Sequence, residues 1–270
     1  MSATATNQPI YSPETAIAAL QSDDNQIRYY AAWWAGKHQV GEACEALCEA
    51  LQDDCYRTPQ GGYPLRRQAA RALGQLKNPE TVPALIEALG VATDVQLQEA
   101  AIQALAAIGD PRAIAPLVAL FEAGGNLPYE ALIEALASLE VWSVRDRVEP
   151  FLANPSERVQ CAAARYFYLM TGEAQYLDRI IQMLGHDNPY LRWAAAFDLG
   201  AICSFGTRFA NGHVQAAKAI VDAKIANSLK LLNLKRILST LVEDNRDGVP
   251  DRPEKIGFLI QSIDDLLLQL

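Results

Sequence analysis

The N-terminal part of the chain contains one helical pattern twice. Residues 28–51 read RYYAAWWAGKHQVGEACEALCEAL, and residues 66–89 read RRQAARALGQLKNPETVPALIEAL. Both segments begin with arginine, continue with an alanine pair and a glycine (Gly36 or Gly74), and end in Glu-Ala-Leu. In the second copy, apolar residues recur at intervals of three and four on each side of a turn at 74–79, which is typical of two packed helices. One such hairpin cannot bury its apolar faces alone, so the repetition predicts an array of stacked hairpins.

The pattern continues along the chain with a period of roughly 31 to 32 residues, which is typical of solenoid proteins. We take 15–52 as the first unit. Further copies occupy 99–121, 129–152 and 158–184, and a last copy begins at Arg192 and departs from the pattern at a glycine-containing break. We therefore predict an all-α fold of about six helical hairpins followed by C-terminal helices. The alanine pair and the turn proline resemble those of HEAT repeats, which join into a right-handed superhelix.

Length and composition agree with an elongated protein. We expect one HEAT-repeat domain over 1–270, with a disordered start at 1–10, repeats over 15–203 and C-terminal helices over 212–270. Residues 1–8 lack the apolar segment of a signal peptide, and no apolar run approaches the roughly 18 residues of a membrane span. Five cysteines, an odd number, suit a reducing compartment. These features predict a soluble cytoplasmic protein without membrane insertion. A formal net charge of −9 argues against a nucleic-acid partner, because phosphate binding depends on clustered Lys and Arg.

Three features of the sequence resemble metal sites, and none of them is predicted to bind a metal. Cys44, Cys48, Cys55 and His38 could in principle hold zinc, but Cys44 and Cys48 align with two apolar positions of the next repeat, which favours core packing. No histidine is followed by Glu, which excludes the di-iron site of HEAT-repeat deoxyhypusine hydroxylases. The loop at 243–254 resembles a calcium-binding EF-hand loop, but it begins with Glu and contains a proline, so a solvated acidic turn is favoured.

Aromatic and arginine residues gather in two clusters. The first joins a helix of the first repeat to the insertion after it and contains Tyr29, Tyr30, Trp33, Trp34, Tyr56, Arg57, Tyr63, Arg66 and Arg67. The second, in the fifth and sixth repeats, contains Arg165, Tyr166, Tyr168, Tyr190, Arg192, Trp193, Phe197 and Asp198. Trp33 and Trp34 align outside the apolar stripe, so we expect their rings to need a partner beyond their own hairpin. Such clusters suit a large, flat, conjugated ligand with carboxylate arms. The aromatic rings would stack on its plane, and the guanidinium groups would bind its carboxylates. The alternative is packing between repeats, with arginine stems on apolar surface.

Four stretches of the chain resemble a known family. They are RYYAAWWAGK, YRTPQGGYPLRRQAARALG, DNPYLRWAAAFDLGAI and IANSLKLLNLKRIL, and the similarity extends from about residue 11 to residue 241. They are similar to the E-type subunit of the heterodimeric E/F phycobilin lyases of cyanobacteria and red algae. The resemblance implies an enzyme that works with an F-type HEAT-repeat subunit. Together they would attach phycocyanobilin through a thioether to a cysteine of the apo-phycocyanin alpha subunit. Phycocyanobilin would be the substrate, and no cofactor is expected.

Site roles follow from the physical properties of the residues combined with this resemblance. Because thiol addition to a bilin depends largely on positioning, the chain needs no nucleophile of its own. We assign propionate binding to Arg57, Arg66, Arg67 and Arg192. Stacking or wall positions are assigned to Tyr29, Tyr30, Trp33, Trp34, Tyr63 and Trp193. Asp198 is the predicted catalytic acid, because a carboxylate stabilises a bilin cation beside it.

Two other functions remain open at this point. One is a noncatalytic HEAT-repeat adaptor or bilin chaperone. The other is a related lyase subunit that also isomerises the bilin or serves a phycoerythrin-type chain. At the C-terminal end, apolar residues of IGFLIQSIDDLLLQL recur at intervals of three and four, which predicts an amphipathic helix with an apolar stripe. The stripe consists of Ile256, Leu259, Ile260, Ile263, Leu267 and Leu270. We expect this helix to cap the last repeat, and the F-type subunit to use the face that carries the aromatic rings.

Overall fold

The computed structural model describes residues 9–91, 94–203, 210–243 and 252–269. These residues form helices and turns, and no strand occurs among them, which confirms the all-α prediction. The chain consists of two compact units, 1–144 and 145–270. The right-handed superhelix and the single continuous domain stay predictions. None of the helices in the described segments is both long and apolar enough to cross a bilayer.

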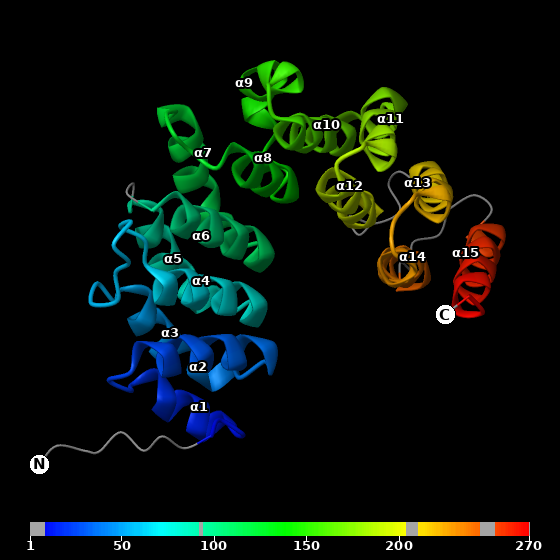
Figure 1. Cartoon of the computed structure of the whole chain (residues 1–270). Helices are drawn as coiled ribbons and strands as arrows, with labels where there is room; N and C mark the ends of the chain where they lie inside the picture. Colours follow the sequence, from blue (N-terminus) through cyan, green and yellow to red (C-terminus); the bar gives the residue numbers. More distant parts are fainter. Residues whose placement is uncertain (1–8, 92–93, 204–209, 244–251, 270) are drawn as a thin grey trace, which may run out of the picture. The chain divides into compact units, whose positions relative to one another are not determined.

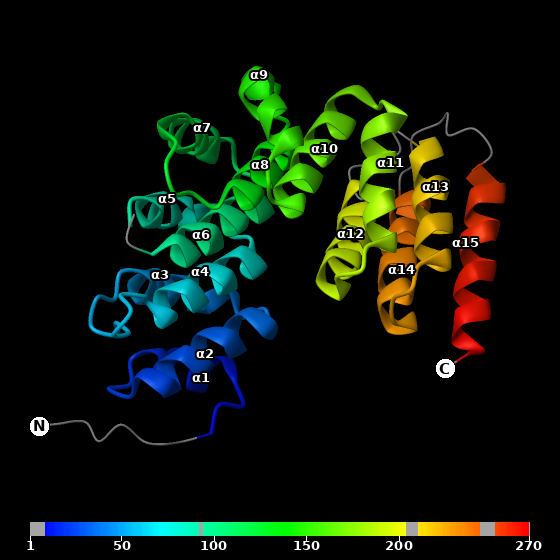
Figure 2. The same ribbon diagram turned by 45° about the horizontal axis from the view of Figure 1, so that its top comes forward.

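Unit 1 is built from two layers of helices (Figures 1 and 2). The long layer contains α2 (Asn25–Lys37), α4 (Pro64–Leu76), α6 (Val95–Ile108) and α8 (Tyr129–Ser138), each packed against the next. The short layer contains α1 (Pro13–Leu20), α3 (Cys44–Leu51), α5 (Val82–Leu89) and α7 (Ile114–Ala123). Short 3₁₀ helices lead into the second helix of each hairpin, namely η1 (Gly41–Ala43), η2 (Pro79–Thr81) and η3 (Pro111–Ala113). Leucines such as Leu47, Leu73, Leu85 and Leu105 lie fully buried between the layers. The helical hairpins predicted from the repetition are therefore present.

The shared glycine of the repeat allows the long helices to pack closely. A Cβ atom on Gly36 would lie 2.9 Å from the Cα atom of Ala72 on α4, and one on Gly74 would lie 2.8 Å from the Cα atom of Ala104 on α6. Carbon atoms in contact normally keep about 3.5 to 4.0 Å apart, so any side chain here would force the helices apart. The glycine thus marks the contact between one repeat and the next.

Replacing Gly74 by alanine is expected to lower the free energy of unfolding by about 1 to 3 kcal/mol, because the added methyl group overpacks the α4–α6 contact. Gly41 is the matched control, because a Cβ atom there meets nothing within 4 Å. The Gly41→Ala change should shift the same quantity by less than about 1 kcal/mol. Chemical denaturation followed by circular dichroism measures both. Equal effects of the two substitutions would contradict the role given to Gly74.

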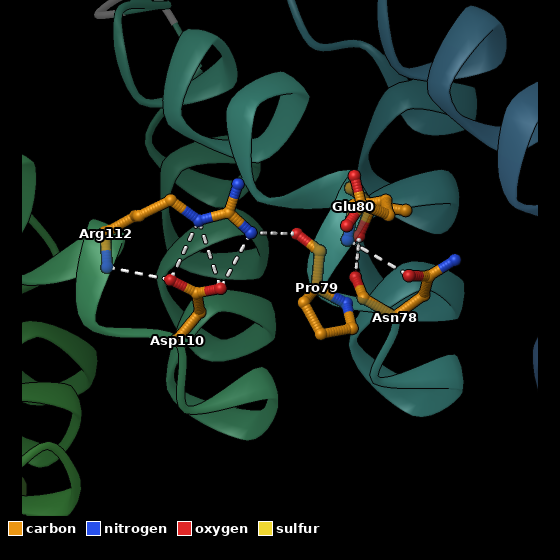
Figure 3. A network of polar contacts seen from close by, with 6 residues as sticks. Asn78, Pro79, Glu80, Asp110 and Arg112 are labelled. Carbon is orange, nitrogen blue, oxygen red and sulfur yellow. Dashed lines mark hydrogen bonds and ion pairs between the residues drawn. The ribbon is translucent and has the colours of Figure 1, made fainter.

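Polar contacts also join one repeat to the next (Figure 3). Asn78 and Asp110 each precede a proline and accept a hydrogen bond from the backbone N–H two residues later, at 3.0 and 2.8 Å. These contacts begin η2 and η3 as side-chain caps do in longer helices. Arg112 donates through Nη2 to Asp110 at 2.7 Å and to the carbonyl oxygen of Pro79 at 2.7 Å. One arginine therefore links the turns of consecutive hairpins.

The fourth repeat differs from the predicted hairpin. Its first helix is α8, but its second part is divided into η4 (Trp142–Val144), α9 (Arg145–Val148) and η5 (Glu149–Ala153). Pro150 lies in this part of the repeat, and proline has no N–H to donate to the preceding turn. The boundary between the two units falls within the same stretch.

Unit 2 continues with helices that pack in sequence. After α9 and η5 come α10 (Glu157–Thr171), α11 (Ala174–Gln182), η6 (Met183–Gly185), α12 (Pro189–Ile202), α13 (Ala210–Asp222), α14 (Asn227–Glu243) and α15 (Arg252–Leu267). α10 packs on α11 and α12, α12 packs on α14, and α14 packs on α13 and α15 (Figure 2). The fifth hairpin and the C-terminal helices are present as predicted.

The C-terminal helix α15 covers α14, as expected of a cap. Its buried apolar residues are Leu259, Ile263 and Leu266. Ile260 and Leu267, which the sequence placed in the apolar stripe, are each 47% exposed, so that assignment was wrong for them. The stripe that α15 buries differs because its contacts with α14 and α13 select which residues face the core, and the three-and-four spacing alone does not.

Candidate functional site

Helix α2 presents exposed aromatic side chains in unit 1. Tyr29, Tyr30 and Trp33 are 39%, 48% and 36% exposed. Positions three and four apart share one face of a helix, and the rings of Tyr30 and Trp33 stack at 5.3 Å between centroids. The Nζ atom of Lys37 lies 4.6 Å from the ring centre of Trp33, within the range of a cation–π contact. Buried Ala31, Ala32 and Ala35 hold the opposite side of α2 in the core.

Trp34 is less exposed than Trp33 and has another stacking partner. It is half-buried and stacks on His38, one turn later in the chain, at 4.1 Å between ring centroids. Both tryptophan rings thus have contacts at their own helix, and the expectation that they need a partner beyond their own hairpin stays a prediction. For Trp33, the exposed ring stays available to a ligand or a protein.

The insertion between α3 and α4 forms a tight turn around one tyrosine. Thr58 accepts hydrogen bonds from the N–H groups of Gly61 and Gly62, and Gly61 has a φ of 87°, which favours glycine. The ring centre of Tyr63 lies 5.5 Å from the guanidinium carbon of Arg57 and 5.0 Å from that of Arg66. Three of the predicted residues are thus brought together at the N-terminal end of α4.

Ion pairs fix this insertion to the helices on both sides. Arg28 of α2 pairs with Asp53, and Arg66 of α4 pairs with Asp54 at 2.6 Å. Asp54 is largely exposed, with 76% of its side chain accessible, whereas the Arg66 side chain is only 11% exposed. Arg57 has no carboxylate partner among the residues that the structure describes.

Arg67 is held by a buried aspartate, Asp94. Its Nε and Nη2 atoms donate to the carboxylate at 2.9 and 2.8 Å, and the Asp94 side chain is 1% exposed. The same carboxylate accepts from the N–H groups of Tyr63 and Leu97 and so begins α6. Burial raises the pKa of Asp94, but the hydrogen bonds from Arg67, Tyr63 and Leu97 outweigh it, and the pKa lies below its ordinary value. Sequence reasoning missed Asp94, although its position before an apolar run is typical of an N-cap.

Charge differs between the helices of the first two hairpins. The charged residues of α2 and α4 are all basic, namely Arg28, Lys37, Arg66, Arg67 and Arg71. Those of α3 and α5 are all acidic, namely Glu45, Glu49 and Glu87. Three of these basic residues, Arg28, Arg66 and Arg67, are paired with the aspartates Asp53, Asp54 and Asp94.

In unit 2, α12 carries a second row of aromatic rings. Tyr190 and Trp193 are 56% and 49% exposed and stack at 6.4 Å between ring centroids. Phe197 follows one turn later, with its ring centre 4.5 Å from that of Trp193. Arg192, the predicted propionate ligand of this cluster, instead donates to backbone carbonyl oxygens of His186, Asp187 and Lys224 at 2.7, 2.9 and 3.2 Å.

Asp198, the predicted catalytic acid, lies beneath this row. It is 4% exposed, and its carboxylate accepts from Arg158 at 2.7 Å and lies 4.0 Å from the guanidinium of Arg165. Tyr166 and Tyr168, expected in the ligand cluster, are buried in the core, and burial raises the pKa of each to about 12. Their place in the ligand cluster was wrong, because α10 is enclosed by its neighbours on most of its circumference.

A cavity of about 360 Å³ opens between α12 and α14. It is lined by Phe197, Leu232, Asn233, Lys235, Arg236 and Ser239. Apart from Phe197, sequence reasoning did not identify these residues, because nothing in the pattern of α14 shows that its charged face meets α12. A second cavity, of about 470 Å³, lies near Arg192 and includes His186, Asp187, Asp222 and Lys224.

The cysteines occupy three kinds of environment. Cys44 is buried, Cys48 is half-buried and Cys55 is exposed, and all five cysteines are free thiols. Burial raises the pKa of the Cys48 thiol to about 11.

Within the described ranges, no group of three or more His, Cys, Asp or Glu residues is arranged to hold a metal ion. Most of the loop weighed as a calcium site lies outside the described residues.

Comparison with known proteins identifies the family. Residues 63–137 match HEAT repeats. The chain is 62% identical to the bilin biosynthesis protein PecE of Mastigocladus laminosus, over 100% of both chains. It is 41% identical to the phycocyanobilin lyase subunit alpha of Nostoc sp. strain PCC 7120, over 96% of each. Its structure resembles a chain of the CpcE–CpcF complex of phycocyanin lyase from Nostoc sp. PCC7120, with a TM-score of 0.82, 39% identity and 98% of both chains covered. The chain therefore belongs to the family of E-type bilin lyase subunits that includes PecE and the phycocyanobilin lyase alpha subunits.

Proposed function

We propose that this chain is the E-type subunit of a heterodimeric lyase that attaches phycocyanobilin to a cysteine of a phycobiliprotein alpha chain. The proposal rests on identity over the full length to PecE and to a phycocyanobilin lyase alpha subunit. An F-type subunit is the proposed partner, because the similar solved chain comes from a complex of CpcE with CpcF. Apo-phycocyanin alpha is the first acceptor to test. Five free thiols suit a cytoplasmic location.

The reaction depends more on positioning the bilin and the acceptor thiolate than on a reactive group of the enzyme. A thiolate of the acceptor forms a bond to the ethylidene carbon of the bilin, the carbon–carbon double bond is consumed, and a proton is added to the bilin. Nothing leaves, so the enzyme needs no nucleophile of its own. Holding the bilin and the thiol in the reactive geometry can supply much of the acceleration. The role of Asp198 as the acid stays a prediction: its carboxylate is buried and already accepts from Arg158, so it would have to leave this pair to stabilise a protonated bilin.

The four arginines predicted to bind propionates differ in the partners that they already have. Arg57 is exposed and can turn to a propionate. The Arg66 side chain is 11% exposed and pairs with the exposed Asp54, so a propionate would have to replace that aspartate. Arg67 already binds the buried Asp94, and Arg192 already binds three carbonyl groups. We therefore favour Arg57 and Arg66, with Tyr63 between them as a stacking surface. Tyr29, Tyr30 and Trp33 would extend this surface along α2.

Changing both Arg57 and Arg66 to Gln is expected to weaken phycocyanobilin binding by about 1.5 to 3 kcal/mol for each charge-assisted hydrogen bond that is lost. Titration of the bilin into the complex, followed by its absorbance, measures this. Arg145→Gln is the control, because the Arg145 side chain is 61% exposed and pairs only weakly with a surface aspartate. Wild-type affinity in the double variant would place the propionates elsewhere.

Co-expression tests the proposed function itself. The chain is produced with an F-type subunit, a bilin supply and an apo-alpha subunit, and covalent colour is read on a denaturing gel. A coloured alpha subunit that requires this chain is the expected result. A noncatalytic bilin chaperone would give no covalent colour even with the partner present.

An isomerising lyase, or one directed to another phycobiliprotein, is the second candidate. The chain is 62% identical to PecE but 41% identical to the phycocyanobilin lyase alpha subunit. Members of one family that differ to this extent can have different activities, so the chain need not share the acceptor or the product of the alpha subunit. Phycocyanin and phycoerythrin-type alpha subunits should therefore be offered side by side. A product whose absorbance differs from that of attached phycocyanobilin would favour isomerisation.

A further inference from the structure

We propose that the insertion between α3 and α4, residues 53–63, is a preformed loop that presents Arg57 and Tyr63 to the bilin. In this proposal, Asp53 and Asp94 are positioning residues, which hold the loop without touching the ligand. The choice of ligand rests on the proposed function. The evidence is a set of hydrogen bonds and ion pairs that tie the beginning, the middle and the end of the loop to α2, α4 and the start of α6.

The helical repeat does not itself require a loop of this length. Residues 52–63 separate α3 from α4, whereas residues 90–94 separate α5 from α6. The connection after the first hairpin is therefore more than twice as long as the connection after the second. Ordering a longer loop costs more conformational entropy, and residues that bind ligands are concentrated on loops held by a rigid scaffold. The additional residues are thus better explained by binding than by folding.

Asp53 holds the beginning of the loop. Its carboxylate accepts hydrogen bonds from the backbone N–H groups of Cys55 and Tyr56, at 2.9 and 3.0 Å. The same carboxylate pairs with the guanidinium of Arg28 on α2, and the side chains of Arg28 and Asp53 are only 16% and 11% exposed. Burial raises the pKa of Asp53, but the hydrogen bonds from Tyr56 and Arg28 outweigh it, and the pKa lies below its ordinary value. Asp53 therefore ties the backbone of the loop to α2.

Thr58 closes the middle of the loop into a turn. Its hydroxyl oxygen accepts a hydrogen bond from the N–H group of Gly62 at 3.0 Å, and its own N–H group donates to the carbonyl oxygen of Gly62 at 2.8 Å. The carbonyl oxygen of Thr58 accepts from the N–H group of Gly61, also at 2.8 Å. Gly62 is buried against Arg67, and a Cβ atom on Gly62 would lie 2.9 Å from the guanidinium carbon of Arg67. The closed turn therefore lies directly on the guanidinium of Arg67.

Asp94 holds the end of the loop. Its carboxylate pairs with Arg67, whose guanidinium supports the turn, and it accepts from the backbone N–H group of Tyr63 at 2.8 Å. Tyr63 is the last residue before α4, so this hydrogen bond fixes the peptide that carries its ring. The ring centre of Tyr63 lies 5.5 Å from the guanidinium carbon of Arg57, on the other side of the turn. Arg67, placed among the propionate ligands by the sequence, is an anchor of the loop in this proposal.

A preformed loop lowers the free-energy cost of binding. A ligand that orders a flexible loop must offset the conformational entropy that the loop loses, and this offset reduces its affinity. When contacts within the protein order the loop during folding, the binding groups already stand at the geometry that the ligand needs. The proposal therefore predicts a loop that is ordered in the absence of the bilin, and weaker binding when that order is lost.

Hydrogen–deuterium exchange tests whether the loop is preformed. The full chain is prepared in complex with the F-type subunit, and exchange is followed in a peptide that covers residues 53–63. We expect slow exchange of this peptide both before and after phycocyanobilin is added, because its N–H groups are already bonded within the protein. Fast exchange in the free complex that slows only with the bilin would show that the ligand orders the loop, and would overturn the proposal.

A neutral variant tests the link between loop order and affinity. Thr58→Val removes the hydroxyl acceptor of the turn but keeps the shape and charge of the loop. We expect faster exchange of the 53–63 peptide and phycocyanobilin binding that is about three- to tenfold weaker, with the urea midpoint of unfolding unchanged. Thr240→Val is the matched control, because it removes a hydroxyl that bonds a backbone carbonyl of α14 at 3.1 Å, and it should change neither readout.

A charge variant tests Asp53 through the sign of its effect. Asp53→Asn keeps an acceptor for the loop N–H groups but removes the charge that holds Arg28. Loss of a negative charge near an anionic ligand would by itself strengthen binding, so the weakening of about three- to tenfold that we expect can come only from lost positioning. Asp54→Asn removes the same charge from an exposed neighbour and should leave binding equal or tighter. Tighter binding by Asp53→Asn would overturn the role given to Asp53.

Binding and covalent transfer together separate this proposal from the proposed function. Wild-type bilin affinity in the Thr58→Val complex would overturn the positioning role, and covalent transfer by the wild type would leave the lyase proposal standing. Absence of covalent product from the wild type, with binding weakened by Thr58→Val as expected, would refute the lyase proposal and leave the loop as a positioned bilin-binding element. A wild-type complex that binds no phycocyanobilin would overturn both.

Discussion

Replacing Leu85 by alanine is expected to lower the free energy of unfolding by about 2 to 5 kcal/mol. Leu85 lies on α5 with no exposed surface, between the two helix layers of unit 1. Removing its side chain eliminates buried apolar contacts and leaves a cavity that the tightly packed layers close only in part. The equivalent change at the fully buried Leu73 on α4 should have an effect of the same size.

Leu268 supplies a matched control for this prediction, because it is 87% exposed. Leu268→Ala removes the same atoms from a place where they contact solvent, and it should change stability by no more than about 0.5 kcal/mol. Urea denaturation followed at 222 nm measures both variants. If Leu85→Ala cost no more than Leu268→Ala, the two-layer core described for unit 1 would be wrong.

Asp94→Asn is expected to destabilise the protein by about 3 kcal/mol, at the low end for a broken buried ion pair because 22% of the Arg67 side chain remains exposed. Asparagine is also a good N-cap residue, so the change removes the charge while keeping the cap of α6. Asp54→Asn is the comparison, because Asp54 is largely exposed and its pair with Arg66 should contribute no more than about 1 kcal/mol.

The effect of Asp94 should depend on pH in a defined direction. Its pKa in the folded protein lies below the ordinary value of about 3.9, so its stabilising contribution is fully present above that value. The contribution is lost as the pH falls through the lowered pKa, because the protonated carboxyl no longer pairs with Arg67. The stability difference between wild type and Asp94→Asn should therefore be constant near neutral pH and decrease below about pH 4. A difference that grows on acidification would contradict the assigned ion pair.

Local sequence patterns were enough to predict the hairpins of the array. The apolar spacing, the repeated glycine and the Asn-Pro and Asp-Pro turns each act within a few residues, so their structural consequence can be read from the sequence. The rings of Tyr29, Tyr30, Trp33 and Trp193 are exposed, and their assignment to a ligand stays a prediction. The repeat pattern was wrong for the second part of the fourth repeat, where Pro150 interrupts a helix that the pattern continued.

The sequence by itself determined the helical repeat, the approximate limits of the repeat units and the membership of a family whose motifs are contiguous. Only the tertiary structure decided what each polar or aromatic side chain contacts. Arg67 meets an aspartate 27 residues away, Tyr166 and Tyr168 become core residues, and α14 brings Lys235 beside Phe197 of α12. The reason is physical: helix formation depends on neighbours along the chain, whereas partners and burial depend on how distant helices pack, which no local spacing encodes.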